Sequence, residues 1–175
     1  MAEPLKNIYS QELVECLAKS FKSYYPAFND EAFIQSVLAD DWQTLELKQR
    51  MRRIAQTLGD YLPKDYPKAI DILLATAQEF SGMQHMFFPD FVELFGLEHF
   101  NVSMQALAKL TCGSTAEFAI RPFIINQPKK TIKQMAKWSR SSNEHIRRLS
   151  SEGCRPRLPW AMALPEYKQD PTEIL

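Results

Sequence analysis

The spacing of apolar residues is the feature that most constrains the fold of this chain, because it is helical along almost the whole sequence. Apolar side chains recur three and four positions apart, as on one face of an α-helix. Leu13, Leu17 and Phe21 form the first such stripe, in a helix that Ser10 can cap and that ends before Pro26. No short run shows the alternation or the β-branched content of a strand. The pattern therefore predicts an all-α protein.

Capping residues, prolines and glycines divide the chain into about nine expected helices. Asn29 or Asp30 caps the second helix, and Asn143 caps the last, which Gly153 ends from the C′ position. After the first helix, the expected ranges are 30–38, 44–61, 67–77, 89–96, 97–110, 114–124, 130–139 and 143–152. Within 44–61, three arginines are expected to face largely outward, namely Arg50, Arg52 and Arg53.

Glu117 has two possible roles on sequence grounds. It stands three residues after Ser114, which is the spacing of a capping box at the start of a helix. In the apolar run that follows, Pro122 lies too far along to be a first-turn proline. This helix is therefore expected to be short or bent. The setting TAEFAIRPFI is also apolar, so burial would raise the pKa of the Glu117 carboxyl group, as a general base or a cation-stabilising carboxylate requires. The residues alone leave both roles open.

The order of the helices predicts a HEAT-like or armadillo-type superhelix of antiparallel helix pairs. Pairs recur at about 35 to 45 residues, the spacing of such arrays, although no crisp repeated motif is present. A bundle around one core is the alternative. We expect residues 1–175 to form one helical-repeat domain. Asp170 and Pro171 begin an expected helix, but the sequence ends at Leu175 after barely one turn. Because a single turn is not stable by itself, we expect the array to continue in a longer protein.

The formal net charge of zero conceals a strongly basic segment. Residues 121–160 hold ten Lys and Arg against two Glu, a net charge of +8, whereas residues 1–120 carry −6 and residues 161–175 carry −2. The local charge decides which partner a surface attracts. The run WSRSSNEHIRRLSSEGCRPRLPW adds an indole at each end of its cations. This combination suits a polyanion with flat bases.

Cations of this segment are candidate phosphate ligands, because guanidinium groups bind phosphate oxygens in bidentate fashion. The candidates are Lys137, Arg140, Arg147, Arg148, Arg155 and Arg157. Prolines around Arg157 stiffen its loop and lower the entropy lost on binding. The alternative is a solvated basic face, or pairing with Glu144 and Glu152. Trp160 lies beside this loop rather than in a helix stripe, so it is the tryptophan expected to be exposed for stacking or cation contact.

Several other kinds of site are missing from the sequence. It contains no P-loop, dinucleotide fingerprint, Ser-His-Asp candidate or HExxH pattern. Cys16, Cys112 and Cys154 are scattered, which predicts three free thiols, no zinc and a reducing compartment. No apolar run approaches the roughly 18 residues of a membrane span, and the N-terminus is unlike a signal peptide. We expect a cytoplasmic protein without membrane contact, cofactor or metal, and no obligate protein partner is evident.

The motifs NEHIRRLSSEGCRPRLPWA, AEFAIRPFI and LELKQRMRRIA resemble the AlkC branch of the AlkC/AlkD DNA alkylation repair glycosylases. The likeness runs from the start of the chain to about residue 165. It implies a right-handed superhelix whose concave, positive face holds duplex DNA. It also implies monofunctional glycosylase activity on cationic N-methylated bases of the 3-methyladenine type, which leaves an abasic site.

The resemblance also assigns roles to individual residues. Glu117 matches the acidic catalytic residue of the family, and Trp160 matches the aromatic residue that lines the lesion site. Arg148, Arg155 and Arg157 match arginines that grip DNA. The family has a second catalytic aspartate in later repeats, which has no match here, and Asp170 is not equated with it. The resemblance therefore leaves the activity of this chain alone open, whereas the full-length protein is expected to be an enzyme.

Two other functions are compatible with the sequence. The first is a non-catalytic relative that binds duplex DNA but releases no base. The second is a HEAT-type interaction scaffold, whose basic groove would take an acidic peptide instead of DNA.

Overall fold

The structure, a computed structural model, describes residues 3–174, and every regular element in that range is helical. The α-helices are α1 (Gln11–Tyr24), α2 (Asp30–Val37), α3 (Leu47–Tyr61), α4 (Tyr66–Ala77), α5 (Phe87–Phe95), α6 (Phe100–Leu110), α7 (Arg121–Asn126), α8 (Pro128–Trp138), α9 (Glu144–Gly153) and α10 (Pro165–Gln169). Short 3-10 turns are η1 (Leu5–Ile8), η2 (Trp42–Thr44), η3 (Met83–His85) and η4 (Thr172–Ile174). The predicted all-α class is confirmed. Leu175, at the end of the last expected helix, lies outside the described residues.

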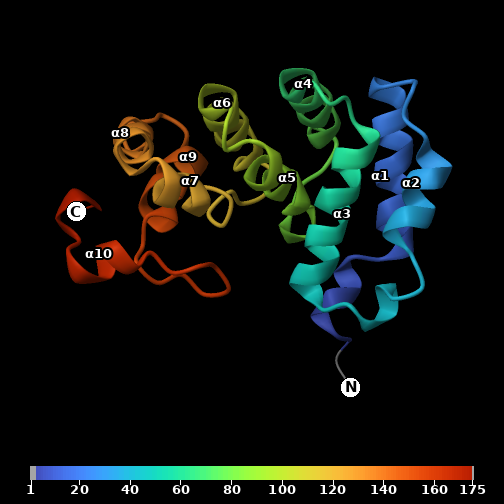
Figure 1. The fold of residues 1–175 in the computed structure, drawn as a ribbon, viewed down its shortest axis with the longest axis horizontal. Coiled ribbons are helices and arrows are strands. Elements are labelled where there is room, and N and C mark those ends of the chain that lie inside the picture. Colours follow the sequence, from blue (N-terminus) through green and yellow to red (C-terminus); the bar gives the residue numbers. More distant parts are fainter. Residues whose placement is uncertain (1–2, 175) are drawn as a thin grey trace.

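The helices form an arched array in which each packs on helices one to three places away in the chain (Figure 1). α1 contacts α2 and α4, α3 contacts α5, and α5 contacts α6, while α8 contacts α7 and α9. In Figure 1, α4, α6 and α8 follow the upper edge of the arch, and α3, α5 and α7 lie below them. This arrangement is a superhelical array of helix pairs, as predicted, and not a bundle around one core.

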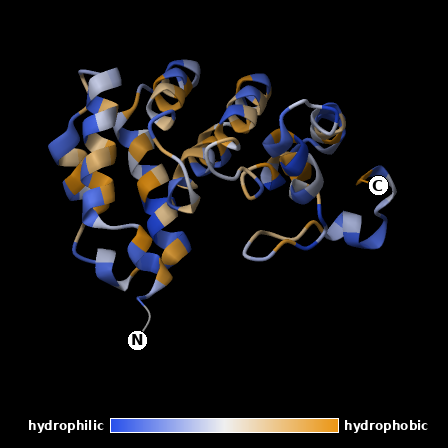
Figure 2. Cartoon of the chain, turned by 180° about the vertical axis from the view of Figure 1, so that it is seen from behind, coloured by the Kyte–Doolittle hydropathy of each residue, from blue (hydrophilic) through white to orange (hydrophobic). Residues whose placement is uncertain are grey.

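Apolar side chains hold neighbouring helices together along the arch. Figure 2 shows hydrophobic residues on the helix faces that meet other helices, and hydrophilic residues on most of α10. Part of this core is aromatic: the ring centroid of Phe28 lies 5.3 Å from that of Phe21 and 5.2 Å from that of Phe33. Each fully buried side chain of this kind contributes about 1.5–3 kcal/mol to folding. Between residues 3 and 174, no helix has both the length and the apolarity needed to cross a membrane.

The expected N-caps are confirmed where a polar side chain precedes an apolar stripe. Ser10 accepts a hydrogen bond from the backbone N–H of Leu13, and Asn29 accepts one from Ala32. Asn143 accepts from the N–H groups of His145 and Ile146. Such caps satisfy backbone donors that the first turn leaves free, and each contributes about 1 kcal/mol.

Arg50 corrects the expectation that the arginines of α3 face outward. Its side chain is 3% exposed, and its guanidinium donates to the carbonyls of Lys6 and Tyr9 and lies 4.9 Å from the ring of Trp42. Two backbone acceptors, both bound by Nη1, and an aromatic face compensate part of the loss of water around the charge, while Nε and Nη2 have no partner among the described residues. Arg53 instead forms an ion pair with Asp41 at the surface.

The segment 114–120 corrects a second expectation, because it forms turns and not the start of a helix. The capping box between Ser114 and Glu117 is therefore absent, and the Glu117 carboxylate has a different partner. α7 begins at Arg121, so Pro122 does stand in a first turn, where its missing N–H costs nothing. Gly153 is also not a left-handed C′ residue: it ends α9, and its missing Cβ leaves room for Ile120 and Met135.

Arg121 is the most completely buried charged residue of the described chain, with no exposed surface. Its guanidinium donates to the carbonyls of Gly153, at 3.0 Å, Pro156, at 3.4 Å, and Met162. All three acceptors come from the end of α9 and the loop after it. Arg121 therefore joins that loop to α7, although more than thirty residues separate them in sequence.

We expect Arg121→Met to lower the free energy of unfolding by about 3 kcal/mol or more, because it leaves buried carbonyls without donors. Urea unfolding measures this loss. Arg53→Met, which removes a surface ion pair, is the control and should cost less than about 1 kcal/mol. Equal losses in the two variants would contradict the role given to Arg121.

Candidate nucleic-acid interface

The loop of residues 154–164, here called the strap, reaches from the end of α9 toward α3 below the arch (Figure 1). The bonds of Arg121 hold its two ends, and the N–H of Leu164 donates to the carbonyl of Pro156 across its base. Trp160 lies near the tip and is 59% exposed, whereas Trp42 and Trp138 are buried. The exposure expected of Trp160 is therefore confirmed.

An apolar pocket lies between the strap and the first helices of the array. Its walls include Leu47, Met51, Met86, Phe118 and Trp160. Lys48 lies at the same place: its Nζ donates to the Trp160 carbonyl at 2.6 Å and stands 5.5 Å from the centroid of the Phe118 ring. Phe118 follows Glu117 directly, so the residue that bears the candidate carboxylate adjoins a wall of this pocket.

The Glu117 carboxylate is buried and faces one exposed arginine. Its Oε1 lies 2.9 Å from Nη2 of Arg148, and the two side chains are 9% and 61% exposed. Burial raises the pKa of the Glu117 carboxyl group, and nearby Glu152 raises it further, while Arg148 and Arg155 lower it. The carboxylate is thus poorly hydrated, and its countercharge is on a side chain that solvent can reach.

The arginines of α9 and the strap differ in what already binds them. Arg155 donates to Glu152 at 2.7 Å, and Arg147 donates to the carbonyls of Ser141 and Ser142 at the start of α9. Arg157 is exposed, and within residues 3–174 its side chain has no hydrogen bond or ion pair. The structure therefore brings Arg148 and Arg155 together with Glu117, leaves Arg157 free, and uses Arg147 in a loop contact.

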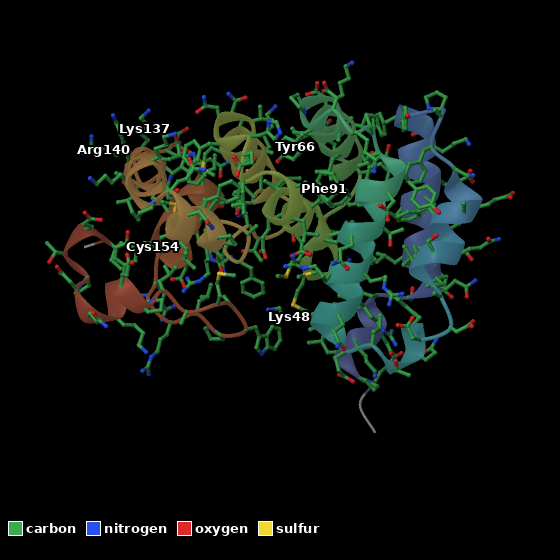
Figure 3. The ribbon with its side chains drawn as sticks, in the orientation of Figure 1. Lys48, Tyr66, Phe91, Lys137, Arg140 and Cys154 are labelled. Carbon is green, nitrogen blue, oxygen red and sulfur yellow. The ribbon has the colours of Figure 1, made fainter. Side chains whose placement is uncertain are left out.

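Lys137 and Arg140 lie elsewhere on the molecule. Figure 3 shows both at the end of α8 on the upper edge of the arch, away from Lys48 and Cys154. Lys137 lines a shallow groove with Lys130 and Lys133, against the start of α6. Over residues 3–174, no hydrogen bond or ion pair connects Lys137 or Arg140 to the cluster around Glu117. Lys137 and Arg140 are close in sequence to the arginines of α9 and the strap, but they form a separate basic surface.

A second buried carboxylate, Asp90 on α5, is not evident from the sequence. It is 2% exposed, and one oxygen lies 2.9 Å from Nη2 of Arg52, which also binds Glu93 at 2.6 Å. Its other oxygen has no partner among the described residues, and Asp90 borders a small cavity with Thr115 and Phe118. Burial raises the pKa of Asp90 to about 7, against the attraction of Arg52. No sequence pattern indicates this burial, because it comes from packing between α3 and α5.

No other kind of centre accompanies this cluster in the described part of the chain. Within residues 3–174, no group of three His, Cys, Asp or Glu side chains is placed to hold a metal ion. Cys16, Cys112 and Cys154 are free thiols, as expected.

Asp90 should make stability depend on pH. Its carboxyl pKa is about 7 in the folded chain against an ordinary value of 3.8, so the folded state holds the proton more tightly. The contribution of protonated Asp90 to the free energy of unfolding is complete below pH 3.8, the ordinary pKa, and is lost as pH rises through about 7. We expect urea unfolding to show stability falling between about pH 5 and 7, by up to 1.4 kcal/mol per unit from this group, and levelling off above pH 7, and Asp90→Asn to remove that fall.

The matched control is Asp41→Asn. The hydrogen bond from Arg53 lowers the pKa of the Asp41 carboxyl group, so this carboxylate is ionised throughout the range. Asp41→Asn should keep the fall in stability. A slope between pH 5 and 7 that is the same in Asp90→Asn as in the wild type would refute the role of Asp90.

Comparison with known proteins gives matches that cover nearly the whole chain. The chain is 46% identical over 171 residues to the uncharacterized protein YhaZ of Bacillus subtilis (strain 168). The aligned region covers 98% of this chain and 48% of YhaZ. In structure it matches Pseudomonas fluorescens alkylpurine DNA glycosylase AlkC, bound to DNA containing an abasic site analog. That match has a TM-score of 0.95 and 38% identity over 99% of this chain and 49% of AlkC. The chain spans about half the length of each relative, and no family model matches it.

Proposed function

By sequence and fold this chain belongs to the AlkC type of helical-repeat proteins, and from that premise we propose that it removes cationic N-methylated bases, of the 3-methyladenine type, from duplex DNA. The observation that carries the proposal is the Glu117 carboxylate, which is buried beside exposed arginines, while the next residue, Phe118, shares a small pocket with the exposed Trp160. A buried negative charge beside a cationic surface is suited to a DNA lesion that is itself a cation.

The proposed reaction is hydrolysis of the N-glycosidic bond. The bond between sugar C1′ and the base nitrogen breaks, and its electron pair neutralises the cationic base, so no proton donor is required. The sugar left behind resembles an oxocarbenium ion, to which water adds with loss of a proton. A carboxylate near the sugar stabilises this positive charge, as in glycoside hydrolysis. We assign this role to Glu117, and stabilisation of the cation by an aromatic face to Trp160.

Arg148 connects DNA binding to the state of Glu117 in this proposal. In the free protein it is the countercharge of the carboxylate, yet most of its side chain is exposed to solvent. A DNA phosphate competes for the same guanidinium, because arginine binds phosphate strongly. When Arg148 turns toward phosphate, Glu117 loses its partner and attracts the cationic lesion instead. Arg155 and Arg157 grip the backbone from the strap.

Excision of base by the protein and by Glu117→Gln tests this function. We expect free 3-methyladenine from methylated duplex DNA, and a decrease of roughly 10² to 10³ for the variant, the usual scale for one preorganised electrostatic group. DNA affinity should not fall, because the change removes a negative charge. The assay is run with these 175 residues alone and within a protein of the relatives' full length.

Controls separate catalysis from folding in this assay. The melting temperature of Glu117→Gln should stay near that of the wild type; a parallel loss of stability and excision would return Glu117 to a structural role. DNA binding without any release of base, in both lengths of protein, would indicate a non-catalytic DNA-binding relative. Displacement of DNA by an acidic peptide at equal concentration would favour an interaction scaffold.

The salt dependence of binding tests the arginines of the strap. On duplex DNA, each phosphate that a protein cation neutralises contributes about 0.9 to the slope of log K against log salt concentration. We therefore expect Arg155→Ala with Arg157→Ala to weaken binding and reduce the slope by up to about 1.8. Lys137→Ala with Arg140→Ala removes the same charge from the upper edge of the arch and reports whether that surface contributes. An unchanged slope in the strap variant would refute the assignment.

A further inference from the structure

We propose that Lys48 is a positioning residue, which holds the tip of the strap and thereby fixes the Trp160 indole beside Phe118, the residue after Glu117. The catalytic consequence rests on the proposed function, whereas the effect on the strap does not. Lys48 lies at the start of α3, and 112 residues separate it from Trp160. The bond between them therefore joins the first helices of the array to its last loop.

The tip of the strap has very few attachments of its own. Arg121 holds residues on either side of the tip, through the carbonyls of Pro156 and Met162. Between them, within the described chain, residues 157–161 make only one internal turn bond, from Ala161 to Leu158, and the bond from Lys48 to Trp160. Lys48 is thus the sole hydrogen-bonded link from the tip to the rest of the described protein.

The backbone at Trp160 needs such a link. Its φ is 66°, the only positive value at a non-glycine residue of the described chain. A bulky residue in this conformation costs about 1–3 kcal/mol and persists only when its surroundings hold it. The Lys48 ammonium binds the carbonyl of this same residue at 2.6 Å.

Lys48 also connects the strap to the carboxylate. Its ammonium stands 5.5 Å from the ring centroid of Phe118, the residue after Glu117. Over residues 3–174 it forms no ion pair; its ammonium contacts the Phe118 ring and the Trp160 carbonyl, and its charge also lowers the pKa of Asp90. One side chain thereby sets the indole relative to the turn that bears Glu117. Removing it should release the indole while the buried core stays intact, because Lys48 is exposed.

Trypsin cleavage in the strap tests the structural part of this inference. Trypsin cleaves after Arg157 but not at the Arg155–Pro156 bond, so one bond reports on the tip. In the full chain, Lys48→Met should increase the rate of cleavage after Arg157 up to about tenfold, the effect of removing a bond of about 0.5–1.5 kcal/mol. Lys48→Arg keeps a donor and should restore most of the protection.

Lys64→Met is the matched control, because Lys64 also donates to a backbone carbonyl, that of Gly59, and is exposed. It removes the same charge and one trypsin site, and it should leave cleavage after Arg157 unchanged. Acrylamide quenching gives a second readout, because Trp42 and Trp138 are buried and Trp160 dominates the quenchable emission. Quenching should increase in Lys48→Met only. Unchanged cleavage and quenching in that variant would overturn the inference.

A double-mutant comparison tests the functional part. If Lys48 acts through Trp160, Lys48→Met in the wild-type background should lower the rate of excision about 3- to 10-fold, which corresponds to the free energy of one hydrogen bond. The same substitution in a Trp160→Ala background should have little effect. An equal decrease in both backgrounds would overturn the positioning role. If the wild type releases no base, the proposed function fails with this catalytic part, and the cleavage and quenching results still decide whether Lys48 holds the strap.

Discussion

The buried guanidinium of Arg121 is the interaction on which the candidate site depends. An arginine without exposed surface is tolerated only when its donors are satisfied, and here the acceptors are carbonyls of Gly153, Pro156 and Met162. These residues belong to the end of α9 and to the strap, so one side chain ties α7, α9 and the strap into one unit. Within the strap, Cys154 and Leu164 are buried in the core, whereas the tip that bears Trp160 is exposed. Without this anchor, neither the arginines of the strap nor Trp160 would have a defined position relative to Glu117.

Electrostatics around Glu117 follow from the same construction. The turn before α7 buries the carboxylate, which raises its pKa, and α9 brings the exposed Arg148 to within 2.9 Å of it. The ion pair is asymmetric, because one partner is desolvated and the other remains in water. Such a pair exchanges its cationic partner more readily than a fully buried one, where separating the charges is costly. A site that must receive DNA phosphates and a cationic base has use for that asymmetry.

The basic character of residues 121–160 is distributed between several roles once the chain is folded. Arg121 is internal, Arg147 holds the loop before α9, Arg155 binds Glu152, and Lys137 belongs to a groove on the other edge of the arch. Only a few cations remain near Glu117 for a polyanion. Net charge in a sequence segment therefore overstates the charge on one surface, since helix geometry sends successive side chains to different faces.

The sequence by itself determined the all-α class and the caps at Ser10, Asn29 and Asn143, because these follow from local periodicity and local hydrogen bonds. The spacing of the helix pairs favoured a superhelical array, but only the packing of the helices excluded a bundle around one core. The motif in the strap also indicated an exposed Trp160. Tertiary structure alone decided that Arg50 and Arg121 point inward, that Asp90 is buried with Arg52, and that Lys48 meets Trp160. It also replaced the capping box of Glu117 by a turn paired with Arg148. Each of these contacts joins residues far apart in the chain, and a buried polar side chain is stabilised by partners whose proximity no sequence spacing encodes.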